Sequence, residues 1–342
     1  MKRLIALLLL SVLLCGCAAA PVEVQQQKHY TATFLNLFDT VTTILGPGET
    51  EEAFHAQARQ LHDQLLRYHQ LFDIYQEYDG MNNLKTVNDQ AGIAPVQVDG
   101  EIIRLLKDCK TYYALTGGKV NVAMGSVLSL WHDARTDALR DPREAAVPSE
   151  AELARASEHT SMDSILIDEA ASTVYITDSQ TRLDVGAVAK GWAVQRVAEN
   201  APGHFLLSVG GNVCATGTKT TTGDPWIIGI QNPDDSSTNL HTLYVYGGAV
   251  VTSGDYQRGY QVQGQWYHHI IDPVTRMPGT LWRSVSVVCD DSALADALST
   301  ALFLLPLEEG KALAATCHAA VLWIDGAGQE YMTSDFEKMI RT

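Results

Sequence analysis

The N-terminal half of the chain repeats its apolar residues at helical spacing. Residues 50–72 (TEEAFHAQARQLHDQLLRYHQLF) place apolar side chains every three or four positions and acidic ones in the first turn, which predicts an amphipathic helix. Residues 99–118 (DGEIIRLLKDCKTYYALTGG) predict a second helix, with Asp99 as its cap and a glycine pair as its stop. The charged stretch 132–159 is helical as well, and we expect it to be exposed.

Strand-like segments dominate the remainder of the chain. Residues 34–45 (FLNLFDTVTTIL) are rich in β-branched and aromatic side chains and stop at GPGE, so they predict one strand. From Ile165 onward such segments follow one another, and helices interrupt them only at 186–200 and 291–306. Because this order lacks a regular strand–helix–strand rhythm, it predicts an α+β fold with mixed sheets and packed helices. There is no internal repeat, so we expect one continuous unit with two lobes.

The helix predicted over 291–306 carries two polar residues in an apolar environment. Asp296 and Thr300 are four positions apart and so share one helix face, with about 5–6 Å between their Cβ atoms. Burying a carboxylate is costly unless a partner pairs with it. The pair therefore indicates either a ligand site or a carboxylate that caps or bonds within its own helix.

Two further segments carry candidate chemistry. In LDVGAVAKGWAVQRV, Asp184 ends an apolar strand and Lys190 lies in the first turns of a helix, a place suited to an anion; a capped helix with a solvated lysine is the alternative. Residues 250–279 predict a hairpin that ends in His268, His269 and Asp272. Since adjacent strand residues point to opposite faces, only one histidine is expected to face a site, as a base or ligand contact, unless it is structural.

The N-terminus and the charge set the compartment and exclude one class of partner. Residues 1–16 read as a signal peptide that ends in a lipobox, Leu14-Cys15-Gly16-Cys17, which predicts lipidation of Cys17; an ordinary secretory signal is the alternative. We expect residues 17–30 to form a lipid-anchored tether on the outer side of the bacterial membrane and 31–342 to form the folded unit. Removing the signal takes away Lys2 and Arg3, so the net charge goes from −16 to −16 − 2 = −18. Such an acidic chain is not expected to bind nucleic acid.

The cysteines and glycines exclude some common sites. The mature chain keeps Cys109, Cys214, Cys289 and Cys317, which lack the CxxC spacing of a zinc site. Both disulfides and buried free thiols remain open for them. Residues 204–220 (HFLLSVGGNVCATGTKT) contain neither GxxxxGK[ST] nor GxGxxG, so a nucleotide site of P-loop or Rossmann type is not expected.

Five motifs in a fixed order give a specific resemblance. DVGAVAKGWAV, LLSVGGN, TSGDYQR, HHIIDPVTRMP and DALSTALF follow one another as in the ApbE family of flavin transferases, and the chain resembles that family from about Phe34 to its C-terminal strands. The resemblance implies one bilobed enzyme that binds FAD in a groove between the lobes. It further implies that Mg²⁺ assists transfer of FMN to a Ser or Thr hydroxyl of a partner protein, an exported or membrane redox flavoprotein, while AMP leaves.

The resemblance also assigns roles to residues of this chain. The implied Mg²⁺ ligands are the Asp296 carboxylate, the Thr300 hydroxyl and the Ala187 carbonyl oxygen. The implied FAD contacts are Phe38, Tyr75, Lys119, Val120, Asn121, Asp184, Lys190 and Ile271. Phe38 stands where many relatives carry Met, and residues 119–121 stand where relatives commonly carry Ala-Phe-Asp, so these contacts depart from the family pattern.

The acceptor hydroxyl is a weak nucleophile and needs a base. His269 is the first candidate, and Asp255 or Asp272 would serve or orient it. Two alternatives to transfer are an FAD pyrophosphatase that releases FMN and AMP to water, and a lipoprotein that binds FAD without turnover. An Mg²⁺ site argues against the second alternative, because passive flavin binding does not need the metal.

Overall fold

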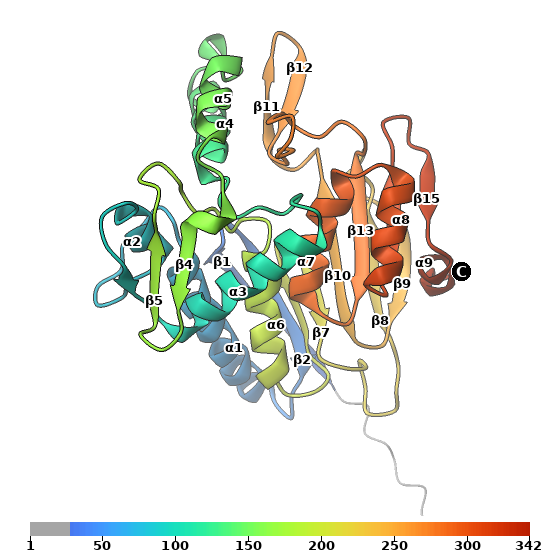
Figure 1. The fold of residues 1–342 in the computed structure, drawn as a ribbon. Coiled ribbons are helices and arrows are strands. Elements are labelled where there is room, and N and C mark those ends of the chain that lie inside the picture. The colour runs from blue at the N-terminus through green and yellow to red at the C-terminus, as the bar shows by residue number, and fades with distance from the viewer. Residues whose placement is uncertain (1–27) are drawn as a thin grey trace, which may run out of the picture.

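A computed structural model describes residues 28–342, and an eight-stranded antiparallel sheet lies at its centre (Figure 1). The predicted signal peptide and Cys17 lie outside the described residues. The strands, in their order across the sheet, are β1 (His29–Leu37), β2 (Thr40–Pro47), β6 (Leu206–Val209), β7 (Asn212–Ala215), β10 (Gly248–Gly254), β13 (Ser284–Cys289), β14 (Ala320–Ile324) and β15 (Glu330–Met332). β1 begins at His29 and so includes the last two residues of the predicted tether, His29 and Tyr30.

Helices cover one face of the sheet, and a hairpin and a short helix cover the other. The first face packs against α1 (Glu51–Phe72), α6 (Ala189–Asn200) and α7 (Ser292–Phe303), followed by α8 (Leu307–Thr316). The opposite face packs against β8 (Trp226–Gln231), β9 (Asn239–Val245) and α9 (Ser334–Met339). Alternate residues of β14 divide between the two cores: Val321 and Trp323 face the helices, and Leu322 faces the hairpin.

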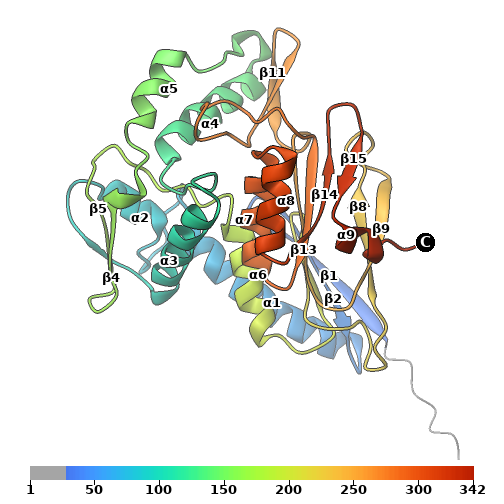
Figure 2. The same ribbon diagram turned by 45° about the vertical axis from the view of Figure 1, so that its right-hand side comes forward.

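A second group of elements stands beside the large sheet (Figure 2). A small sheet has the order β3 (Val96–Gln97), β5 (Thr173–Ile176), β4 (Ile165–Asp168), and α2 (Leu84–Asp89) and α3 (Gly100–Leu115) adjoin it. An arm made of α4 (Gly125–Arg140) and α5 (Glu150–Ser157) projects from the same side as the hairpin β11 (Gly259–Val262) and β12 (Gln265–His268); 3₁₀ turns lie at Pro142–Glu144 and Met162–Ser164. The arm contacts the hairpin through stacked rings of Trp131 and Tyr267, 5.9 Å apart.

The α+β fold and the main helices are confirmed. α1 begins after Thr50, whose hydroxyl accepts a hydrogen bond from the Ala53 N–H, and Asp99 caps α3 by accepting from the Glu101 N–H. No helix within residues 28–342 is long and apolar enough to cross a membrane.

The prediction of one strand over 34–45 is wrong. The segment forms the hairpin β1–β2, with Phe38 and Asp39 in its turn at φ values of 51° and 52°. Both turn residues are in the left-handed region, which short hairpin turns require and which Gly or Asn normally supplies. Phe-Asp carries no such signal, so the sequence pattern runs through the turn as if the strand continued.

The four cysteines of the described chain are free thiols. Cys214 and Cys289 both pair with Ala249 from opposite sides of β10. Two strand spacings, roughly 9–10 Å, therefore separate their backbones, which is beyond the reach of a disulfide.

Candidate active site

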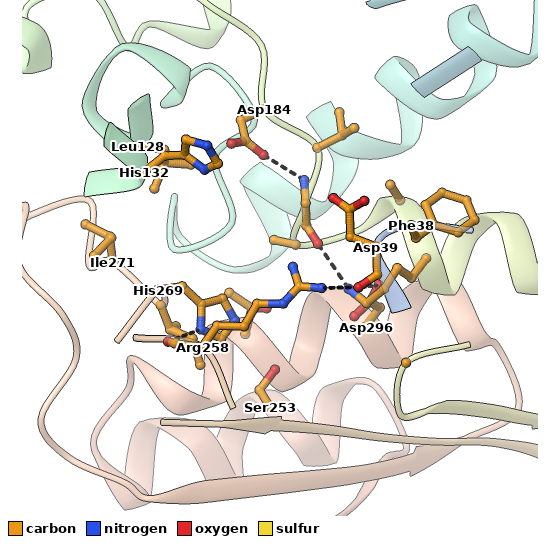
Figure 3. Close-up of a pocket in the computed structure, with 18 of the residues that line it drawn as sticks. Phe38, Asp39, Leu128, His132, Asp184, Ser253, Arg258, His269, Ile271 and Asp296 are labelled. Atoms are coloured by element: carbon orange, nitrogen blue, oxygen red, sulfur yellow. Dashed lines mark hydrogen bonds and ion pairs between the residues drawn. The ribbon is translucent and has the colours of Figure 1, made fainter. Parts of the chain in front are cut away.

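A cavity of about 920 Å³ lies where the large sheet and its helices meet the α3–α4 segment and the β11–β12 hairpin (Figure 3). The predicted site residues on its wall are Phe38, Tyr75, Lys119, Val120, Asn121, Asp184, Ala187, Lys190, His269, Ile271, Asp296 and Thr300. Asp255 and Asp272 are not among the lining residues. The chain thus brings together side chains that are more than 250 positions apart in sequence.

Asp296 presents a buried carboxylate at the end of this cavity. Its side chain is 5 % exposed, and Oδ2 accepts a hydrogen bond of 2.8 Å from the Gly191 N–H of α6. The Lys190 ammonium lies 3.8 Å from the same oxygen, and the buried Asn212 amide faces the carboxylate without a well-formed hydrogen bond. Burial raises the pKa of Asp296, and Lys190 opposes the rise only in part. A further cation beside this carboxylate would relieve the cost of its burial.

Gly191 makes this approach of the two helices possible. A Cβ at this position would collide with the Ser292 carbonyl oxygen and the Asp296 Cβ, so only glycine lets α6 and α7 cross so closely. The Gly191 N–H would ordinarily bond to the carbonyl four residues earlier, which is that of Ala187. Because it bonds to Asp296 instead, the Ala187 carbonyl at the cavity wall accepts no hydrogen bond from residues 28–342.

The oxygen atoms gathered here fit Mg²⁺ by their chemistry. The Thr300 hydroxyl, one helical turn from Asp296, also lines the cavity and makes no hydrogen bond within residues 28–342. One carboxylate with two neutral oxygens suits an ion that fills its other positions with water and phosphate oxygens. No group of three His, Cys, Asp or Glu side chains in the described part of the chain could hold a metal, which argues against a zinc site.

Asp184 and Lys190 also line the cavity, and Figure 3 shows the Asp184 carboxylate there. Asp184 Oδ1 accepts a hydrogen bond of 2.9 Å from the Gly186 N–H, and the Gly186 carbonyl accepts one of 3.2 Å from Lys190 Nζ. Enclosure by the cavity wall raises the pKa of the Asp184 carboxyl despite the Gly186 hydrogen bond. Lys190 is thus held at the cavity by one carbonyl and by the Asp296 carboxylate, with donors left for an anion.

The two adjacent histidines have different environments, as the strand pattern predicts. His268 is buried, accepts a hydrogen bond at Nδ1 from the Ile270 N–H, and donates from Nε2 to the Gly279 carbonyl at 2.7 Å, so both of its nitrogens are satisfied. His269 faces the cavity, and its Nδ1 lies 3.2 Å from the Arg258 carbonyl oxygen. A carbonyl only accepts, so the proton is on Nδ1 and Nε2 is left with a free lone pair.

His269 is neutral at physiological pH. Its ring is accessible to the cavity, yet the protein atoms that form the wall desolvate it, and this is the main cause that lowers its pKa; the positive charge of Arg258 lowers it further. A neutral imidazole with a free Nε2 is the form that accepts a proton.

The predicted partners of His269 are corrected by the structure. The Asp255 carboxylate pairs with Arg283, with 3.7 Å between Oδ1 and Nε, and Asp272 pairs with Lys119, with 2.9 Å between Oδ2 and Nζ. Neither carboxylate contacts His269. The backbone carbonyl of Arg258 holds the ring instead.

Lys119 and Asp272 form an ion pair that joins the segment after α3 to the segment after β12. Their side chains are only 17 % and 16 % exposed, and Asp272 Oδ1 also accepts from the Val274 N–H at 2.8 Å. The Lys119 charge is therefore already neutralised, so it is less available to a ligand than the resemblance implied.

We expect this ion pair to stabilise the fold measurably. Lys119→Met and Asp272→Asn should each lower the free energy of unfolding by about 1–3 kcal/mol, a value between those of exposed and buried pairs. Urea unfolding of both single variants and the double variant gives the coupling energy, which should be about 1 kcal/mol or more. Purely additive losses would show that the two residues act independently.

Aromatic groups also line the cavity, and Figure 3 shows Phe38 beside Asp39 and near Asp296. Tyr75 is 56 % exposed and stacks on His132 with ring centroids 5.2 Å apart. Phe38 reaches the cavity from the β1–β2 turn, and its backbone N–H donates to Nδ1 of His69 at 3.3 Å. Both rings are therefore placed where they can contact a planar ligand.

Sequence reasoning missed several lining residues, namely Asp39, His132, Arg135, Asn212 and Arg258. Asn212 and Arg258 end the motifs LLSVGGN and TSGDYQR, and membership of these motifs could have identified them as candidate site residues. His132 and Arg135 lie in the charged stretch that was expected to be exposed, and only the docking of α4 brings them to the cavity.

Comparisons with known proteins show which family this chain resembles in sequence and fold. The sequence profile of the ApbE family matches residues 37–323. The FAD:protein FMN transferase of Treponema pallidum is 34 % identical over 250 residues, covering 67 % of each chain, and that of Vibrio cholerae is 27 % identical over 342 residues, covering 96 % of each. The crystal structure of the ApbE protein from Thermotoga maritima superimposes with a TM-score of 0.81 at 26 % identity, covering 92 % of this chain and all of that one.

Proposed function

This chain belongs to the ApbE family of flavin transferases, and we propose that it moves the FMN part of FAD to a Ser or Thr hydroxyl of a partner protein and releases AMP. The observation that carries the proposal is the buried Asp296 carboxylate, which stands at the cavity beside Lys190 and two free oxygen ligands. A binding protein for a flavin would gain nothing from such a costly carboxylate.

The cavity suits a large, partly aromatic anion. Its volume of about 920 Å³ is at the upper end of the usual range for ligand sites. The exposed ring of Tyr75 and the Lys190 ammonium, both on the cavity wall, supply a stacking surface and a positive charge. FAD, with two ring systems joined by a pyrophosphate, has this combination of groups.

Asp296, Thr300 and Ala187 would hold the Mg²⁺ ion. When bound, Mg²⁺ would neutralise pyrophosphate oxygens and the charge that develops on the departing AMP. Lys190 would add a second positive charge on the same side, held in place by the Gly186 carbonyl.

The reaction is a substitution at the FMN-side phosphorus. The acceptor hydroxyl gives its proton to Nε2 of His269 while its oxygen forms a bond to that phosphorus. The bond from the phosphorus to the oxygen shared with AMP breaks, and its electron pair leaves with AMP. The protein mainly positions the two reactants and stabilises charge, which is how most phosphoryl transfer is catalysed.

We also propose that the protein works outside the cytoplasm, anchored through lipidated Cys17, where an exported or membrane redox subunit would be the acceptor. The support is the lipobox at residues 14–17. Cys17→Ser should release the protein from the membrane fraction of expressing cells. Unchanged membrane association of the variant would exclude the anchor.

Incubating the protein without residues 1–17 with FAD, Mg²⁺ and a candidate acceptor tests the activity. We expect AMP release together with a fluorescent acceptor band, and both should vanish with EDTA or when the acceptor hydroxyl is replaced by Ala. AMP and FMN formed equally without an acceptor would identify a pyrophosphatase. FAD binding without AMP would contradict an enzymatic role.

A further inference from the structure

Arg258 is a cation at the cavity whose charge no carboxylate of the described chain neutralises. Its guanidinium makes one long hydrogen bond, 3.4 Å from Nη2 to the Asp39 carbonyl oxygen. Two other cavity cations have acidic neighbours, because Lys119 pairs with Asp272 and Lys190 lies near Asp296. In a chain of net charge −16, an arginine that lines a cavity and pairs with no carboxylate of the described residues is a candidate contact for an anion.

The same residue is tied to the proposed base. The Arg258 carbonyl accepts hydrogen bonds from both the backbone N–H and the Nδ1–H of His269, each 3.2 Å long. The hairpin register explains this contact, because Gly259 pairs with His268 and so places the preceding residue beside the following one. Figure 3 shows the side chain running from His269 toward Asp39 and Asp296.

This position determines which phosphate the guanidinium can reach. The acceptor oxygen must lie within hydrogen-bond distance of His269 Nε2 and about 3–3.5 Å from the phosphorus it attacks. Because the Arg258 side chain begins next to His269 and runs along the cavity toward Asp296, its guanidinium can reach the oxygens of that same phosphorus. The Asp296 and Lys190 group would then face the side from which AMP leaves.

We propose that Arg258 binds the non-bridging oxygens of the FMN-side phosphate and stabilises their charge during the substitution. The inference rests on the proposed transferase function and adds a residue to it. On binding, the guanidinium exchanges the long contact to Asp39 for phosphate oxygens, which its forked donors match in geometry. No bond of Arg258 is made or broken and no proton leaves it.

A purely structural role is a poor explanation for this residue. The side chain is exposed, and its contact of 3.4 Å is at the long limit of a hydrogen bond. Replacing the side chain keeps the carbonyl that orients His269, so the histidine tautomer should survive in any Arg258 variant.

The test compares Arg258→Gln, Arg258→Lys and Arg140→Gln in the detergent-solubilised full-length protein. Arg140 is exposed on α4 and pairs with Asp137 outside the cavity, so its variant removes the same charge elsewhere. We expect Arg258→Gln to slow single-turnover AMP release at saturating FAD by about 10²–10³-fold, as for loss of one transition-state donor. Arg258→Lys should recover part of the rate, while Arg140→Gln should match the unmodified protein, and all melting temperatures should stay equal.

A spectroscopic measurement separates this role from a structural one. With ¹³C-labelled histidine, the NMR titration of His269 should show a higher pKa in Arg258→Gln than in the unmodified protein, because the neighbouring charge is gone. A rate within about threefold of the unmodified enzyme, or a rate loss matched by an equal fall in melting temperature, would overturn the proposal.

Failure of the proposed function can be told apart from failure of this inference. If the unmodified protein releases no AMP, the transferase proposal fails, and inorganic pyrophosphate becomes the probe for Arg258. Weaker pyrophosphate binding by Arg258→Gln than by Arg140→Gln would then support an anion contact. Equal binding by the two variants would reject it.

Discussion

Replacing Asp296 by asparagine should abolish flavin transfer and at the same time stabilise the metal-free protein. Activity is lost because the variant removes the only carboxylate among the proposed Mg²⁺ ligands. The loss should exceed about 100-fold, which is the upper value for removing a residue that only hydrogen-bonds to a metal ligand. The gain in stability follows because a neutral amide is cheaper to bury, and its oxygen can still accept from the Gly191 N–H. A rise in melting temperature of about 2–4 °C corresponds to about 1 kcal/mol in a domain of 150–250 residues.

The pH dependence of this stabilisation has a definite sign. Burial raises the pKa of Asp296 in the folded protein above its value in the unfolded chain, about 3.9. Ionisation therefore costs folding free energy at every pH above the unfolded value, and the cost grows until the pH passes the folded pKa. The difference in melting temperature between Asp296→Asn and the unmodified protein in EDTA should be smallest near pH 3.5 and should grow as the pH rises above the unfolded value.

Asp291→Asn is the matched control on the same helix. Asp291 caps α7 by accepting from the Leu294 N–H, and asparagine caps about as well as aspartate. This variant should keep its activity and its melting temperature. Mg²⁺ should raise the melting temperature of the control but not that of Asp296→Asn. A destabilised Asp296→Asn protein in EDTA, or an equal response of both variants to Mg²⁺, would contradict this account.

The helices that position the site were predictable because their signals are local. The caps Thr50 and Asp99 and the apolar spacing of α1 and α3 each lie within one segment. The polar pair Asp296 and Thr300 was also predictable, because it contrasts with the apolar residues around it in the same helix. The spacing of residues along the chain does not predict the crossing of α6 and α7. That crossing depends on Gly191 and leaves the Ala187 carbonyl without its usual helical hydrogen bond.

The neighbours of His269 were not predictable in the same way. Asp255 and Asp272 are near it in sequence and carry charges, so they were the natural candidates for orienting the ring. In space the ring is held by a main-chain carbonyl, which any residue type offers and which leaves no mark in the sequence. The position of Arg258 beside His269 depends on the β11–β12 register, which the sequence does not specify. The β1–β2 turn likewise depends on a left-handed backbone conformation that the residue types Phe38 and Asp39 do not predict.

His269→Ala should lower the rate constant of transfer by about 10²–10⁴-fold, the usual contribution of a general base. Its Nδ1–H is bound to the Arg258 carbonyl and its Nε2 faces the cavity, so the variant removes the proton acceptor and little of the packing. FAD affinity should be unchanged, because the ring is proposed to contact the acceptor hydroxyl rather than the flavin. Single-turnover AMP release, measured beside FAD fluorescence titration, separates the two quantities.

His268→Gln is the control for this experiment, and the pH profile gives a second check. His268 is buried with both nitrogens bonded, so its variant should lower the melting temperature more than the rate. The pKa of His269 in the free enzyme is lowered below its ordinary value, so the base stays neutral as the pH falls through about 6.5. The ratio kcat/KM should therefore be flat across that range and fall only at lower pH. A fall in kcat/KM centred near pH 6.5 that disappears in His269→Ala would mean that the ring is not desolvated as described. A full transfer rate in His269→Ala would show that the histidine is not the base.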